Sequence, residues 1–72
     1  MNDDQLEGSD RETRDRLAVA RQEHADLDAA IEAVGLLPVP DALLIGRLKR
    51  KKLLLKDEIS RLEDLLTPDI IA

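Results

Sequence analysis

The residues of this sequence that could do chemistry are a dense run of cations, one histidine and many scattered carboxylates. Clustered cations attract polyanions, so the run could bind a phosphate backbone or an anionic membrane surface. It forms a basic face made of Arg47, Lys49, Arg50, Lys51, Lys52 and Lys56. Acids expected on the facing helix, a net charge of -5 and the absence of aromatic residues favour a solvated face that is neutralised within the chain.

His24 is the only histidine, and a metal site needs at least three convergent ligands. A two-fold axis could bring two copies of His24 together with Asp28, but we expect a histidine hydrogen-bonded to a carboxylate or the backbone. Lys52 is expected to pair with Asp28 or Glu23, because an activated lysine needs a desolvated pocket. The sequence therefore predicts no catalytic, metal-binding or cofactor-binding residue, no cofactor and no enzyme activity.

The composition bounds the class of protein. With 72 residues, the chain forms one domain at most, and so small a core favours self-association. The absence of cysteine excludes disulfides and fits a reducing cytoplasm. No Phe, Tyr or Trp is present to stack on bases or to anchor at a membrane surface. The acidic N-terminal residues do not resemble a signal peptide, and no apolar run is long enough to span a membrane.

The elements that position these residues are two helices, predicted at about 10–34 and 41–66. A capping-box spacing, Ser9 followed by Glu12, predicts the first helix start after a disordered acidic arm, 1–8. In the hinge, 35–40, Gly35 is expected to close the helix in the left-handed conformation, and the prolines prevent its continuation. Asp41 is either the N-cap of the second helix or a first-turn residue after Pro40. Residues 67–72 form a short tail.

Alternating steps of three and four residues place one side of each helix in a continuous seam. In the first helix the seam contains Leu17, Ala20, His24, Leu27, Ile31 and Val34. In the second it contains Ile45, Leu48, Lys52, Leu55, Ile59, Leu62 and Leu66. The short hinge predicts that the helices pack antiparallel as an all-α, coiled-coil-like hairpin.

Charges agree with this antiparallel register. Acids of the first helix, such as Glu23 and Glu32, come level with the basic face, and Arg16 comes near Glu58. Four leucines of the second helix lie outside the seam, and a lone hairpin would leave them in water. They are the candidate oligomer contacts Leu43, Leu53, Leu54 and Leu65. The sequence therefore predicts a dimer of hairpins that forms a four-helix bundle.

Two motifs carry a family resemblance: His24-x-x-Leu27-Asp28-x-x-Ile31, and Leu48-Lys49-Arg50-x-Lys52-Leu53-x-Leu55-Lys56-Asp57-Glu58-Ile59. Together they resemble the YdcH family of small bacterial proteins, over a stretch from near Leu17 to Leu62. The resemblance implies a helical hairpin in the bacterial cytoplasm and brings no established activity.

The residues favour a non-catalytic, cytoplasmic hairpin that self-associates and acts in protein interaction, as an adaptor or regulator. The alternative is an accessory protein associated with nucleic acid or the ribosome through the basic face. An unidentified protein partner is compatible with either, whereas a membrane span is not expected.

Overall fold

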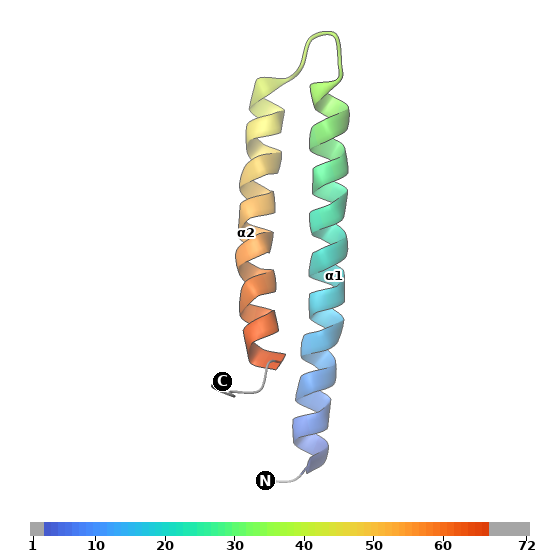
Figure 1. Ribbon diagram of the computed structural model, residues 1–72, viewed down its shortest axis with the longest axis vertical. Helices are drawn as coiled ribbons and strands as arrows, with labels where there is room; N and C mark the ends of the chain where they lie inside the picture. The colour runs from blue at the N-terminus through green and yellow to red at the C-terminus, as the bar shows by residue number, and fades with distance from the viewer. Residues whose placement is uncertain (1–2, 67–72) are drawn as a thin grey trace, which may run out of the picture.

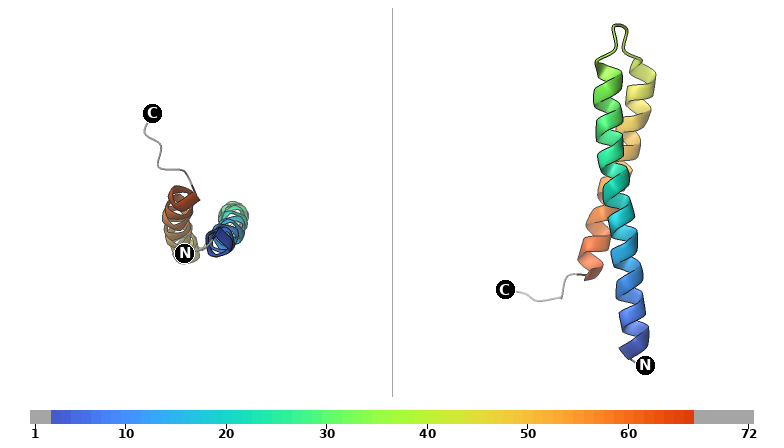
Figure 2. Two further views of the ribbon diagram at one scale, coloured as in Figure 1. Left: turned by 90° about the horizontal axis from the view of Figure 1, so that it is seen from below. Right: turned by 90° about the vertical axis from the view of Figure 1, so that its right-hand side faces the viewer.

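The computed structural model describes the backbone of residues 3–66 and the side chains of residues 10–66. Two helices occur, α1 at Asp3–Gly35 and α2 at Ala42–Leu66, and this part of the chain contains no strand. The helices run side by side in opposite directions (Figure 1) and cross at a small angle (Figure 2). The predicted all-α antiparallel hairpin is confirmed.

The first helix begins earlier than the capping-box spacing predicted. α1 starts at Asp3, so Ser9 is inside the helix, and the expected disordered arm is helical from residue 3 onward. The segment opens with two aspartates, which favour a first helical turn, and continues with Gln-Leu-Glu, which have high helix propensity. α1 has 33 residues and α2 has 25, so α1 extends beyond α2 at the open end of the hairpin (Figure 1).

The end of α1 differs from the expected glycine cap. Gly35 is the last helical residue and does not have a positive φ. Instead, the Leu36 amide donates to the carbonyls of Glu32 and Ala33, each at 3.2 Å, and the Leu37 amide donates to Val34 at 3.2 Å. These three- and four-residue hydrogen bonds tighten the last turn, so no left-handed residue is needed. The hinge is therefore 36–41.

The start of α2 resolves the two alternatives for Asp41. Its Oδ1 accepts a hydrogen bond from the Leu44 amide at 3.0 Å, and its carbonyl accepts from the Ile45 amide at 2.9 Å. Asp41 is thus the N-cap residue, whose side chain satisfies an amide that the first turn leaves without a partner. α2 ends at Leu66, as predicted, and the tail 67–72 lies outside the described residues.

Replacing Asp41 by alanine is expected to lower the free energy of unfolding by about 1 kcal/mol, because the Leu44 amide loses its acceptor. Urea unfolding followed by circular dichroism measures the effect. Asp41→Asn is the matched control, since asparagine keeps a side-chain oxygen and caps about as well. Equal losses in the two variants would contradict the capping role.

Candidate functional site

The hairpin core is a single seam between α1 and α2. All thirteen positions of the predicted seam are buried or half-buried. The most enclosed are Leu17, with 6% of its surface exposed, and Ala20, with none. Because only these two described residues are buried, the apolar surface between the helices is small, and polar groups at its edges contribute to holding the helices in register.

Within the described residues, neither helix is long and apolar enough to cross a membrane.

Three ion pairs join the helices across the edges of the seam. Arg16 holds Glu58 with two hydrogen bonds, from Nε to Oε2 at 2.7 Å and from Nη2 to Oε1 at 2.8 Å. On the opposite edge, Lys52 Nζ donates to Asp28 Oδ1 at 2.6 Å. The third pair joins Arg21 to Glu63. The two-point arginine contact fixes orientation as well as distance, so it defines the register most sharply.

The first two pairs shift the pKa values of their members. The hydrogen bond from Lys52 lowers the pKa of Asp28, and the one from Arg16 lowers the pKa of Glu58. The same contact raises the pKa of Arg16. All three charged forms are therefore favoured in the folded hairpin.

Acid is expected to weaken the hairpin. Because the folded pKa values of Asp28 and Glu58 are lowered, their contribution is complete at neutral pH. This contribution to the free energy of unfolding is lost as the pH falls below the ordinary carboxyl pKa of about 4 and through the lowered pKa values of the folded state. Urea midpoints measured by circular dichroism from neutral to acid pH should decline over that range. The double variant Asp28→Asn, Glu58→Gln should start lower and decline less, and an unchanged acid slope would contradict the assignment.

His24 lies in the seam beside Asp28. Its Nδ1 is 3.8 Å from Asp28 Oδ2, one turn further along α1, and this distance is too long for a hydrogen bond. Among the described residues, no group of three or more His, Cys, Asp or Glu side chains could hold a metal ion. Lys52, bound to Asp28, is held by an ion pair at the surface. The side chains of His24 and Lys52 are both half-buried in the seam.

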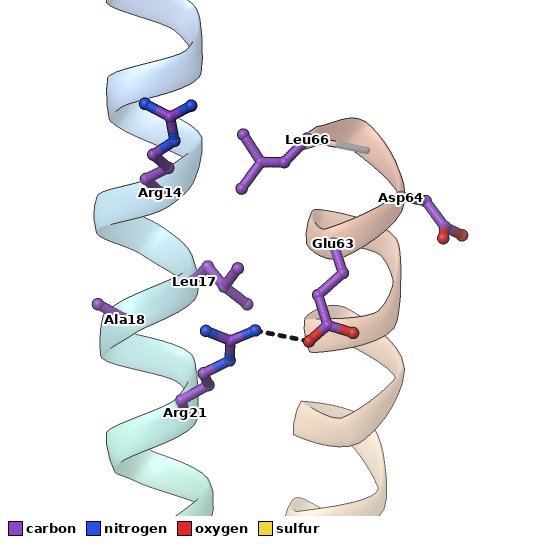
Figure 3. Close-up of a pocket in the computed structure, with 7 residues that line it drawn as sticks. All are labelled: Arg14, Leu17, Ala18, Arg21, Glu63, Asp64 and Leu66. Atoms are coloured by element: carbon purple, nitrogen blue, oxygen red, sulfur yellow. Dashed lines mark hydrogen bonds and ion pairs between the residues drawn. The ribbon is translucent and has the colours of Figure 1, made fainter. Parts of the chain in front are cut away.

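A shallow hollow lies between the helices near the open end of the hairpin. Its lining residues are Arg14, Leu17, Ala18, Arg21, Glu63, Asp64 and Leu66. Figure 3 shows Leu17 and Leu66 pointing into the space between the helices, while Asp64 points away. Arg21 Nη2 donates to Glu63 Oε2 at 2.7 Å across the hollow. The hollow is open to solvent and is bridged by this ion pair, so it offers no enclosed substrate site.

The Arg21–Glu63 pair was missed by sequence reasoning, although the sequence contains a signal for it. Arg21 directly follows the seam residue Ala20, and Glu63 directly follows the seam residue Leu62. Residues that follow seam positions lie at the edges of the seam, where long side chains can meet across an antiparallel pair. Arg21 and Glu63 both directly follow a seam position and carry opposite charges, and these two features together indicate the contact.

The predicted neutralisation of the basic face by α1 is found as an ion pair at one described residue. Within residues 10–66, Lys52 is the one member of the face that forms an ion pair. Glu23 and Asp26 line one hollow together with Lys51, but no ion pair joins them to the face. Arg47 and Arg50 lie on the side of α2 away from α1, so equal height along the hairpin does not bring the charges together. Five members of the face therefore form no ion pair within residues 10–66.

The four candidate oligomer contacts are exposed in the hairpin. Their exposed fractions are 66% for Leu43, 63% for Leu53, 63% for Leu54 and 70% for Leu65. Three of them, Leu43, Leu54 and Leu65, repeat every eleven residues. This spacing is close to three helical turns, so these three form one stripe along α2, which we call the leucine stripe. Leu53 lies on another side of the helix.

The comparison with family models shows to which protein family the chain belongs. A model described as "Protein of unknown function (DUF465)" matches residues 17–63, which include the hinge and parts of both helices. The chain belongs to the DUF465 family. YdcH-like proteins are members of this family, so the resemblance drawn from the two motifs is confirmed. For this DUF465 protein, searches of curated proteins and of solved structures found no match.

Proposed function

We propose that this DUF465 protein is a non-catalytic, cytoplasmic interaction module that self-associates through α2. The observation that carries the proposal is the leucine stripe, three aligned leucines each about two-thirds exposed on a hairpin with little other core. Exposed apolar side chains aligned on one face are typical of protein contacts. Lys52 is paired with Asp28 and His24 is half-buried in the seam, so the proposal gives neither residue a catalytic role.

Sedimentation equilibrium tests self-association. The wild-type chain is expected to form a dimer within the range from about 10 µM to about 1 mM, as is typical of small interfaces. Replacing Leu43, Leu54 and Leu65 by glutamine should give a monomer that keeps its helicity. Leu53→Gln is the matched control, because Leu53 is equally exposed but lies off the stripe. A folded wild-type monomer throughout that range would overturn the proposal.

A second candidate function, binding to nucleic acid, is favoured by the cations that lack a carboxylate partner within the described residues. Five members of the basic face could contact a phosphate backbone. A gel shift at low salt with double-stranded RNA and DNA tests this role. The variant Lys49→Glu, Arg50→Glu, Lys51→Glu should abolish retardation without unfolding the hairpin, because none of these residues forms an ion pair with α1 within residues 10–66. Absence of retardation of the wild type would remove this candidate.

A further inference from the structure

We propose that the second copy packs antiparallel, α2 against α2, in a register that places Leu54 on the two-fold axis. The inference rests on the self-association proposed above and specifies its geometry. It follows from the spacing of the leucine stripe and from the charges beside it.

The leucine stripe has the same spacing in both directions. Leu54 lies eleven residues after Leu43 and eleven residues before Leu65. If α2 is placed against a reversed copy with Leu54 at the centre, Leu43 of each copy comes level with Leu65 of the other. A two-fold interface needs a surface that matches itself in this way. A parallel pair would instead bring each leucine level with its own counterpart.

The charges beside the stripe decide between the two orientations. Arg50 and Lys51 lie four and three residues before Leu54, and Asp57 and Glu58 lie three and four residues after it. Reversal about Leu54 therefore brings the two cations of one copy level with the two acids of the other. A parallel pair would bring like charges level, which is unfavourable.

The charges also lie on matching sides of the stripe. Arg50 and Asp57 are seven residues apart, close to two helical turns, and so are Lys51 and Glu58. Each of these pairs thus lies on one edge of the stripe. In an antiparallel two-fold pair, an edge meets the same edge of the second copy. Arg50 therefore comes near Asp57 of the second copy, and Lys51 near Glu58 of the second copy, each twice.

The partners in this arrangement are available within the described hairpin. Arg50, Lys51 and Asp57 form no ion pair there. Glu58 already accepts two hydrogen bonds from Arg16, but a carboxylate has about four acceptor sites. Two cations that α1 leaves without partners thus gain them in the dimer.

One like-charged contact opposes the arrangement. Arg47 lies seven residues before Leu54 and Arg61 lies seven residues after it, so they come level in the antiparallel dimer. Arg47→Glu would replace this repulsion by an attraction, at two symmetric places. The geometry therefore predicts that this substitution tightens the dimer roughly tenfold, although it removes a cation.

Disulfide cross-linking tests the orientation, since the natural chain contains no cysteine. Leu43→Cys and Leu65→Cys chains are mixed and oxidised with oxidised glutathione. The mixed disulfide is expected to predominate, because Leu43 of two antiparallel copies would be about 33 Å apart, beyond disulfide reach. Predominance of the two homodimeric disulfides would overturn the antiparallel register while leaving self-association intact. A wild-type chain that stays monomeric would overturn both proposals.

Charge reversal provides an independent test without cysteine. Arg50→Asp and Asp57→Arg should each weaken the dimer roughly tenfold, because each creates two like-charged contacts. The double variant should restore the wild-type dissociation constant. Circular dichroism checks that each variant remains helical. Unchanged dissociation constants in both single variants, or a weaker dimer for Arg47→Glu, would overturn the register.

Discussion

Replacing Leu17 by alanine is expected to lower the free energy of unfolding by about 3 kcal/mol. In a hairpin this small, that loss should leave most molecules unfolded. Leu17 is one of two buried residues among those described, and its side chain fills the space between the helices (Figure 3). Removing it leaves a cavity that two helices joined by one hinge can close only by moving together. Helicity at room temperature and the urea midpoint, both by circular dichroism, measure the loss.

Leu53→Ala is the matched control for this substitution. It removes the same atoms from a leucine that is largely exposed and lies away from both the seam and the leucine stripe. Leu53→Ala should change the free energy of unfolding by no more than about 0.5 kcal/mol, as ordinary surface substitutions do. Similar losses in the two variants would mean that Leu17 is not enclosed by α2.

Enlarging Ala20 is expected to destabilise the hairpin by about 2 kcal/mol. Ala20 has no exposed surface, and the distance between packed helices depends on the size of the side chains at their contact. A leucine there would force α1 and α2 apart at the level of the Arg16–Glu58 and Arg21–Glu63 pairs. The expected result is a lower urea midpoint for Ala20→Leu.

Ala29→Leu is the comparison for Ala20→Leu, because Ala29 is exposed on the same helix. Leucine and alanine have similar helix propensities, so this variant should unfold close to the wild-type midpoint. A stabilised Ala20→Leu protein would mean that the seam contains unfilled space beside Ala20.

The register of the hairpin follows largely from the sequence. Steps of three and four residues locate the seam, and the short hinge leaves the antiparallel arrangement as the simple solution. The predicted neighbours Arg16 and Glu58 are indeed paired, and Lys52 contacts one of its two suggested partners, Asp28. These pairs are predictable because their residues lie at the seam or at its edge.

The predicted neutralisation of the basic face yields a single ion pair within residues 10–66, Lys52–Asp28, and the reason is geometric. The prediction matched charges by height along the hairpin and did not include their angle around the helix. At about 100° per residue, successive cations such as Lys49, Arg50 and Lys51 point in widely different directions, and α1 lies on one side only. Height alone therefore overestimates the pairing of a continuous charged run.

Helix ends were harder to predict than helix faces. The capping-box spacing of Ser9 and Glu12 is a real start signal elsewhere, but a sequence with good helix formers upstream can continue the helix through it. Gly35 likewise fits a cap, yet the last turn is closed by ordinary backbone hydrogen bonds. The buried face of a helix is indicated by a periodic pattern over many residues, whereas the end of a helix depends on one or two residues.

The unequal lengths of the two helices divide the protein into regions that should exchange amide hydrogen with solvent at very different rates. The first turns of α1 have no second helix beside them, so their peptide groups can open by fraying while the rest of the molecule stays intact. Amides around Ala20 can open only when the two helices separate. Deuterium uptake should therefore spread along α1 from its beginning toward its middle.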